Sequence, residues 1–401
     1  MNTLFYAKLK NNDYKLYFWR QFFHNWKIFS IFATKKYPIY PVNMNKKKLV
    51  SISIIIPIYN SSRYIGSCID SIFLQECEEA DIECILVNDY TPDNSMEIIH
   101  NKLNNYNGRI HFEIINFDTN RGHCAARNAG IRISIGEYIL FVDSDDTLTP
   151  GTIHYFIEGI KSHGCHNVDV VMGNTFNNAD KIEIMHLKCD TPILINNSDE
   201  TALRKLLSRE LFHTSWNKLV KRSFFTEHQL YFQEGIINED LLWSYLLFHK
   251  MKNILVMPRI TYTYINDNPF NISNTSQKRI RAIIESRILI CNTIIDTPPR
   301  LKKSFIDYYA YILFILVRAI SLYEDCIKDA SGLHDDLFSL RNRFLKSIWK
   351  GKCYLLLLYS LLYVAKPFYY ITRLWIFRRY YDRITKIIVH LQKALISSIN
   401  E

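Results

Sequence analysis

Three aspartates lie close together in FVDSDD, residues 141–146. Residues two apart in extended backbone point to the same side, so Asp143 and Asp145 can face one ligand while Ser144 points away. Two carboxylates held in this way repel each other unless a cation or a shared proton lies between them. A hard divalent ion, Mg²⁺ or Mn²⁺, would satisfy both and keep open positions for substrate phosphates. The alternative interpretation is a solvated acidic turn that caps the next helix.

Two other acidic stretches have the same two interpretations. LVNDYTPDNS, residues 86–95, places Asp89 at the end of an apolar run and ahead of a polar turn. Its residues by themselves fit loop solvation with helix capping as well as they fit a binding site. NED, residues 238–240, supplies Glu239 and Asp240 just before LLWSYLLF. A carboxylate can take the proton of a substrate hydroxyl, and helix capping is again the competing interpretation.

The elements that would position these residues alternate between strand and helix. β-Branched apolar runs predict buried strands, and apolar residues at helical spacing behind them predict helices. A helix should open near Asn94, with Glu97 at capping-box distance, and Thr149 with Pro150 predicts another helix start. This alternation predicts an α/β fold with a mostly parallel sheet, whose ligands bind at the carboxyl ends of the strands. The predicted strands are 49–58, 82–87, 109–116 and 138–142, and 122–133 is a predicted helix.

The composition bounds the class of protein. The chain has 401 residues, 48% of them hydrophobic, which is ample for a large core. Its net charge of +10 favours anionic partners such as phosphates or acidic lipid headgroups. Nine cysteines without a CxxC pair predict the reduced thiols of a cytosolic protein, and no Cys/His cluster has zinc-finger spacing. No GxGxxG follows the first strand, which argues against an NAD enzyme.

Four motifs in chain order resemble the nucleotide-binding half of the family 2 glycosyltransferases, inverting enzymes of the GT-A fold: SIIIPIYN, LVNDYTPDNS, NRGHCAARNAG and GEYILFVDSDD. WNKLVKRSFF (216–225) and EGIINEDLLW (234–243) resemble the acceptor half of bacterial capsule, exopolysaccharide and lipopolysaccharide transferases. The resemblance implies a Rossmann-like nucleotide-binding half and transfer of a hexosyl or N-acetylhexosaminyl group. The implied donor is a nucleotide-sugar, with UDP expected and GDP or dTDP as alternatives. The implied acceptor is a saccharide or lipid-linked saccharide, and no nucleic acid is expected as a partner.

The resemblance also implies roles for the donor-site residues. Asp89 would hydrogen-bond the uracil ring, with the backbone around Pro57 and Tyr59 forming the rest of that pocket. Asp143 would contact the ribose or the metal, and Asp145 would bind the Mn²⁺ or Mg²⁺ that bridges the diphosphate. The complete set implied for nucleotide-sugar binding is Pro57, Tyr59, Asp89, Arg127, Asp143, Ser144 and Asp145.

In the acceptor half, the family's ED motif makes Asp240 the implied general base and Glu239 a supporting contact. Trp216, Asn217 and Lys218 would form the acceptor or diphosphate side of the cleft. Trp216 could stack on a sugar face and Lys218 could meet phosphate as a point charge. Core packing is the alternative for Trp216.

Four side chains near these motifs carry secondary expectations. Arg127 matches a position that commonly lines the nucleotide pocket, with a salt bridge to a strand-end aspartate as the alternative. Asp146 is expected to support its loop or cap the helix. His123 and His213 are expected at the surface or behind the site.

The sequence departs from the family at the second motif. The family's two aspartates followed by glycine become Asn88, Asp89 and Tyr90, while Asp93 is kept at the start of the helix. Tyr90 in place of glycine predicts a turn that does not need a positive φ at this position.

The chain divides into four predicted segments. Residues 1–47 form an N-terminal extension, either an upstream misreading or a loosely ordered arm, and 48–275 form the GT-A catalytic domain. Residues 276–345 form a helical region, and 346–401 form amphipathic helices. The apolar run at 353–365 is shorter than the roughly 20 residues that span a bilayer, so it predicts interfacial helices on an anionic membrane. A buried helical subdomain and a tilted span are the alternatives, and the expected location is cytoplasmic, peripheral on the inner face of the cell membrane.

Two other functions compete with sugar transfer. A nucleotidyltransferase would use a similar acidic metal site but normally carries a Gly-rich, basic loop after the first strand, which PIYNSSRYIGS lacks. A catalytically inactive homologue could scaffold a glycan-synthesis complex. The intact Asp143, Asp145 and Asp240 argue against that second alternative.

Overall fold

The structure is a computed structural model. It describes residues 50–164, 168–184, 189–197, 200–208, 211, 213–265, 277–300, 304, 307–313, 315–316, 319 and 331–350. The predicted N-terminal extension and the amphipathic helices after residue 350 lie outside these residues, as do residues 266–276.

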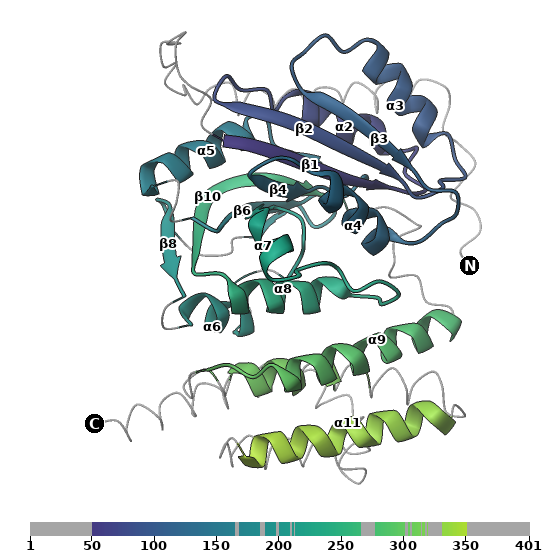
Figure 1. Ribbon diagram of the computed structural model, residues 1–401, viewed down its shortest axis with the longest axis vertical. Coiled ribbons are helices and arrows are strands. Elements are labelled where there is room, and N and C mark those ends of the chain that lie inside the picture. Colours follow the sequence, from purple (N-terminus) through teal and green to yellow (C-terminus); the bar gives the residue numbers. More distant parts are fainter. Residues whose placement is uncertain are drawn as a thin grey trace, which may run out of the picture. The chain divides into compact units, whose positions relative to one another are not determined.

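The motifs that carry the acidic residues lie on a parallel half-sheet (Figure 1). Strand β1 (Val50–Ile58) pairs in parallel with β2 (Ala80–Asn88) and with β4 (Tyr138–Phe141), and β2 pairs in parallel with β3 (His111–Asn116). The predicted strands are therefore confirmed, with ends that differ by one or two residues. Because parallel neighbours run the same way, the carboxyl ends of β1, β2 and β4 meet at one edge.

Each face of this half-sheet has its own core. Ile54 and Ile56 of β1 pack with one buried cluster, which includes residues of α2 (Ile65–Phe73) and α5 (Thr152–His163). Ile55 packs with the other cluster, which includes residues of α4 (His123–Ile133) and α8 (Glu239–Lys250). Alternate residues of a strand point to opposite faces, so an apolar run without polar breaks is what a strand covered on both sides requires.

The acceptor half adds antiparallel pairs to the same sheet. Strand β9 (Lys218–Lys221) lies between β4 and β6 (Val170–Asn177) and is antiparallel to both. Strand β10 (Asn253–Tyr264) is parallel to β6 and antiparallel to the two-residue β5 (Thr147–Leu148). The described sheet has ten strands in the order β3-β2-β1-β4-β9-β6-β10-β5, with β7 (Ile182–Ile184) on β6 and β8 (Ile193–Asn196) on β10. The α/β class is thus confirmed: the motif-bearing half is parallel, and the second half makes the whole sheet mixed.

Two short helices connect strands of the second half of the sheet, and longer helices follow the last strand. Between β8 and β9 lies α6 (Thr201–Leu207), and α7 (Ser223–Glu227) follows β9. The predicted helical region over 276–345 begins with α9 (Gln277–Asp296), where Ser286 Oγ accepts a hydrogen bond from the Ile237 backbone at 2.8 Å. The last described helix, α11 (Ser331–Lys350), runs beside α9 in Figure 1 and buries Ile348. Within the described residues, no helix is both long and apolar enough to cross a membrane.

Two predicted helix starts need correction. Helix α5 begins at Thr152 rather than after Thr149, because Gly151 takes a left-handed φ of 72° before it. Helix α3 (Ser95–Asn104) does follow Asn94, but no side-chain cap bond forms there. Asp93 does the capping instead, with its carboxylate accepting from the Ser95 backbone at 3.1 Å and from the Ser62 backbone at 2.8 Å.

The turn after β2 also differs from the prediction. Tyr90 has a φ of 56°, so the turn does use the left-handed conformation that glycine would adopt without strain. Its ring is 59% exposed, and the neighbouring Thr91 backbone donates to Asn88 Oδ1 at 2.9 Å. The polar bonds of the turn hold a conformation that the residue type itself disfavours.

Candidate active site

The residues that the sequence predicts to bind the nucleobase lie at the ends of β1 and β2. Pro57 is buried opposite Val87 in the parallel pairing, and Tyr59, just past the end of β1, is 46% exposed. Asp89 follows β2 directly, and its backbone donates to Ile58 O at 3.0 Å. The structure therefore brings these predicted residues together at one edge of the sheet.

Asp89 is buried and already well supplied with donors. One carboxylate oxygen accepts from the Arg121 backbone at 2.6 Å, and the other accepts from the Gly122 backbone at 2.8 Å and from Asn120 Nδ2 at 3.0 Å. Burial raises the pKa of Asp89, and these backbone bonds oppose that rise. The carboxylate thus fixes the loop that leads into α4, a role that neither the loop-solvation nor the uracil interpretation included.

Burial alternates along DSDD, as predicted, but the backbone is a turn, closed by the Asp146 backbone donating to Asp143 O at 3.0 Å, and not the extended chain on which the prediction rested. Asp143 and Asp145 are partly exposed, whereas Ser144 and Asp146 are buried. Asp146 accepts from the Tyr262 hydroxyl at 2.8 Å and from the Ile265 backbone at 2.7 Å, so it supports the loop after β10. Burial raises the pKa of Asp146 well above its ordinary value, and the negative charges of Asp145 and Asp143 raise it further.

The donor chemistry of this turn fits a hard divalent cation. Two partly exposed carboxylates at alternate positions offer the oxygen ligands that Mg²⁺ and Mn²⁺ prefer, in a place where negative charge is already concentrated. A second group, His123, Cys124 and Glu239, has its ligand atoms within 4.8 Å of one another. That group fits such a cation poorly, because a thiol and an imidazole are not the oxygen ligands that Mg²⁺ and Mn²⁺ prefer, and burial raises the pKa of the Cys124 thiol.

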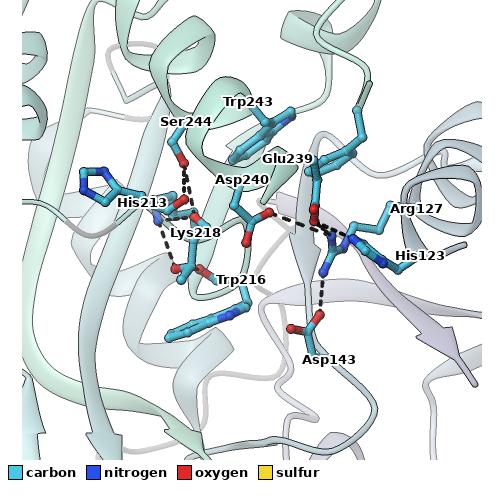
Figure 2. Close-up of polar contacts among 12 residues, drawn as sticks. His123, Arg127, Asp143, His213, Trp216, Lys218, Glu239, Asp240, Trp243 and Ser244 are labelled. Carbon is cyan, nitrogen blue, oxygen red and sulfur yellow. Dashed lines mark hydrogen bonds and ion pairs between the residues drawn. The ribbon is translucent and has the colours of Figure 1, made fainter. Parts of the chain in front are cut away.

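Arg127 of α4 occupies the centre of the site (Figure 2). Its guanidinium is 4% exposed and donates to Asp143 Oδ1 at 2.7 Å and to Glu239 Oε1 at 2.7 Å. The same Nη1 atom lies 3.8 Å from Asp240 Oδ1, and the guanidinium stands over the Phe232 ring at 5.2 Å. The salt bridge to Asp143 is the alternative that the sequence predicted for Arg127, a salt bridge to a strand-end aspartate.

The NED motif stands at the start of α8. Asn238 precedes the helix with a φ of 64° and makes no side-chain cap bond, so helix capping by that residue does not explain the motif. Glu239 is buried and also contacts His123 Nε2 at 2.8 Å. Burial alone would raise the pKa of Glu239. The hydrogen bond from His123 and the charges of His123 and Arg127 outweigh that effect and lower the pKa.

The carboxyl group of Asp240 is only partly satisfied. Oδ1 is buried and has no hydrogen-bond partner within the part of the chain that the structure describes. The side chain as a whole is nevertheless 25% exposed, so the exposure falls on its other atoms. Burial raises the pKa of Asp240, and the charge of Glu239 adds to that rise. A carboxylate whose pKa is raised toward neutrality is suited to accepting a proton.

The WNK residues point into the protein. Trp216 is 5% exposed and stacks on Tyr262, with ring centroids 4.5 Å apart. Asn217 is buried with a φ of 58°, donates to Gly173 O at 2.7 Å and accepts from the Thr261 hydroxyl at 2.5 Å. These contacts describe core packing and a link between strands rather than a face open to a sugar.

Lys218 is fully buried and donates to Thr214 O at 2.5 Å. Burial lowers its pKa to about 7, opposed by the negative charge of Asp240. A fully buried ammonium is not a surface contact for phosphate, and its charge interacts instead with that of Asp240. Because burial depends on the tertiary fold, the motif by itself gave no signal for this placement.

His123 and Tyr262 are site residues that the motifs did not single out for a role. His123 holds Glu239, as described above. The Tyr262 hydroxyl accepts from the Asp143 backbone at 3.1 Å while donating to Asp146, so Tyr262 holds the DSDD turn and Trp216 packs behind it. The backbone carbonyl of His213 accepts a hydrogen bond from Ser244 Oγ at 2.7 Å. This contact agrees with the expectation that His213 lies behind the site.

Comparison with known proteins identifies relatives of the chain. Residues 53–228 match the model of the family described as glycosyl transferase family 2. The uncharacterized glycosyltransferase EpsJ of Bacillus subtilis is 29% identical over 230 residues, which cover 57% of this chain and 64% of EpsJ. A poly(ribitol-phosphate) beta-glucosyltransferase of Bacillus spizizenii is 29% identical over 54% of this chain and 32% of its own length. The chain therefore matches less than two thirds of the length of these relatives.

A solved structure has the same fold. TarS of Staphylococcus aureus, crystallised in complex with UDP-GlcNAc, aligns over 74% of this chain and 81% of the TarS chain with a TM-score of 0.58. Its sequence is 19% identical, so the likeness concerns the fold.

Proposed function

The chain belongs to the family 2 glycosyltransferases, and on this premise we propose that it transfers a sugar from a UDP-sugar to a hydroxyl group with inversion at the anomeric carbon. The acceptor is a growing surface glycan or a lipid-linked saccharide. The observation that carries the proposal is that Asp143, from the DSDD turn that also holds the partly exposed Asp145, and the partly exposed Asp240 lie at one buried arginine. The UDP-GlcNAc bound to TarS, a protein of the same fold, supports UDP as the nucleotide.

In this proposal the two halves of the site divide the reaction. Asp89 and the ends of β1 and β2 position the nucleoside, and Asp143 and Asp145 would hold a Mn²⁺ or Mg²⁺. When bound, that cation neutralises charge developing on the leaving nucleoside diphosphate. Asp240 accepts the proton of the acceptor hydroxyl as its oxygen bonds to the anomeric carbon from the face opposite the departing UDP.

Nucleotide binding tests the donor half. UDP, GDP and dTDP, each with and without Mn²⁺, are compared by thermal shift on the full chain. We expect UDP with Mn²⁺ to stabilise the protein, since a ligand that binds only the folded state raises its melting temperature. Asp145→Ala should remove the metal-dependent part of the shift, and Asp335→Ala, an exposed acid on α11, is the matched control. A panel without any response would contradict the proposal.

Product formation tests the reaction class. Purified protein is incubated with a set of UDP-sugars, and slow donor hydrolysis in the absence of acceptor is followed by release of UDP. Turnover of one donor supports the transferase. Retained UDP binding without turnover of any donor or transfer to any saccharide acceptor would instead favour the inactive, scaffolding homologue.

We also propose that the chain works at an anionic membrane surface, as suits its net charge of +10 and a lipid-linked acceptor. Truncation after Lys350 keeps the whole of α11, including the buried Ile348, and removes the predicted amphipathic segment. The truncated protein should leave the vesicle fraction when sedimented with anionic vesicles. Unchanged sedimentation would contradict the proposed surface.

A further inference from the structure

One buried guanidinium connects the two halves of the site. Arg127 belongs to α4, whereas Asp143 follows β4 and Glu239 and Asp240 open α8. Its two terminal nitrogens are directed to different halves: Nη2 to Asp143 at 2.7 Å, and Nη1 to Glu239 at 2.7 Å and Asp240 at 3.8 Å. Figure 2 shows the carboxylates arranged around it.

The burial of this cluster makes the charge of Arg127 important. Arg127 is 4% exposed and Glu239 is 5% exposed, so water screens their charges little. The two terminal nitrogens of Arg127 each donate a hydrogen bond to a different carboxylate. The planar, forked guanidinium of arginine allows this geometry, whereas the ammonium of lysine does not. Without this cation, Asp143 after β4 would face Glu239 and Asp240 at the start of α8 with no arginine between the three acidic side chains.

The same contacts argue against direct recognition of the donor by Arg127. Both terminal nitrogens already donate to protein carboxylates, and the ring of Phe232 covers one face of the guanidinium. Arg127 can therefore influence the reaction through the carboxylates that it holds.

We propose that Arg127 is a positioning residue for sugar transfer, which orients the base Asp240 and keeps it ionised while tying the start of α8 to the metal-binding end of β4. The inference rests on the proposed function, because it takes Asp240 as the base. It goes beyond that function because it assigns to one residue the positioning of groups in both the donor half and the acceptor half of the site.

Five groups set the charge at Asp240. Glu239 on the same helix and Asp143 after β4 oppose its ionisation. Arg127 and His123 of α4 favour it, and Lys218 of β9 is close enough for the two groups to interact electrostatically. Because Arg127 lies 3.8 Å from Oδ1, loss of its charge should raise the pKa of Asp240 by about 1–3 units.

The pH profile of turnover tests the inference. Arg127→Met keeps the length of the side chain and removes its charge, and Arg132→Met on the exposed side of the same helix is the matched control. We expect the acidic limb of kcat/KM to move by about 1–3 pH units toward higher pH in Arg127→Met, so that the loss of activity is larger at pH 6.5 than at pH 8.5. Arg132→Met should keep the wild-type limb.

The conservative variant sharpens the test. Arg127→Lys restores a positive charge but cannot bridge two carboxylates as a fork. We expect its acidic limb to return toward the wild-type position while kcat stays below the wild-type value. A loss of activity that is equal at every pH in Arg127→Met would show a merely structural role and overturn the inference.

A stability cycle gives a second readout that needs no turnover. Melting temperatures are measured at pH 7.5 for wild type, Arg127→Met, Asp240→Asn and the double variant. Since the amide introduced by Asp240→Asn carries no charge for the guanidinium to compensate, Arg127→Met should lower the melting temperature less in that background than in wild type. Additive shifts would contradict the link between the two residues.

The two readouts separate the inference from the function beneath it. Coupling in the stability cycle with no turnover of any UDP-sugar would refute the proposed function and leave the charge link intact. Turnover with an unmoved acidic limb would refute the inference and leave the transferase intact.

Discussion

The donor half and the acceptor half of the site obtain their polar residues in different ways. In the donor half, Asp89 directly follows a parallel strand, and Asp143 and Asp145 lie in the turn just after another. In the acceptor half, the WNK residues 216–218 lie at the start of an antiparallel strand and turn inward, and the partly exposed acidic side chain, Asp240, comes from the start of α8 instead. Strand ends thus place chemistry in a predictable way, whereas a polar stretch that matches a family motif can be part of the framework.

The largest effect should come from the start of α8. Asp240→Asn should lower the rate of sugar transfer by about 10²–10⁴-fold, because the acceptor hydroxyl loses its proton acceptor. UDP binding with Mn²⁺ should persist, since the donor half is unchanged. Transfer assays and thermal shift measure the two effects, with Asp336→Asn on the exposed side of α11 as the control. Normal transfer by Asp240→Asn would assign the base elsewhere.

Lys218 should affect stability through pH. Burial lowers its pKa to about 7 in the folded state, so between pH 7 and 10 the unfolded chain binds more protons and the native state gains stability as pH rises. The gain is on the order of 3–5 kcal/mol at most. In Lys218→Met this pH-dependent gain should disappear, while Lys221→Met on the same strand should keep it. Melting temperatures at pH 6.5 and 9 measure the difference, and parallel curves for wild type and Lys218→Met would contradict a buried lysine.

Asn217 should behave as part of the framework. Asn217→Ala removes the amide that donates to the Gly173 carbonyl and one of the two acceptors of the Thr261 hydroxyl, and it keeps a left-handed backbone, so it should destabilise the fold by about 2–4 kcal/mol. Denaturant unfolding measures the loss, with the exposed Asn101→Ala as the control. A stable Asn217→Ala protein with weakened acceptor binding would return Asn217 to the acceptor surface.

The smallest effect concerns the donor-half turn. Tyr90→Gly should stabilise the protein by about 1 kcal/mol, because glycine adopts the φ of 56° without the strain that a side chain brings. Lys181→Gly, at a φ of 55° in an exposed turn away from the site, should show a similar gain. Unfolding free energies check both. If UDP affinity falls only in Tyr90→Gly, the exposed Tyr90 ring belongs to the donor pocket.

The sequence by itself determined the parallel half-sheet, the resemblance to family 2 over residues 53–228 and the edge at which the acidic residues meet. These follow from short-range rules: apolar runs without breaks form strands covered on both faces, and the residues just after parallel strands share one edge. The buried Ser144 between the partly exposed Asp143 and Asp145 matches the predicted pattern, although a turn and not extended backbone produces it.

Tertiary structure decided what each polar group contacts. The loop that satisfies Asp89 comes from residues 120–122, the partner of Arg127 on α8 is more than a hundred residues away, and Lys218 is buried by elements that its own motif does not contain. Even the φ of Tyr90 depends on bonds across the turn rather than on residue type. Hydrogen bonding, burial and charge compensation depend on distances between segments remote in the chain, and local pattern carries no information about those distances.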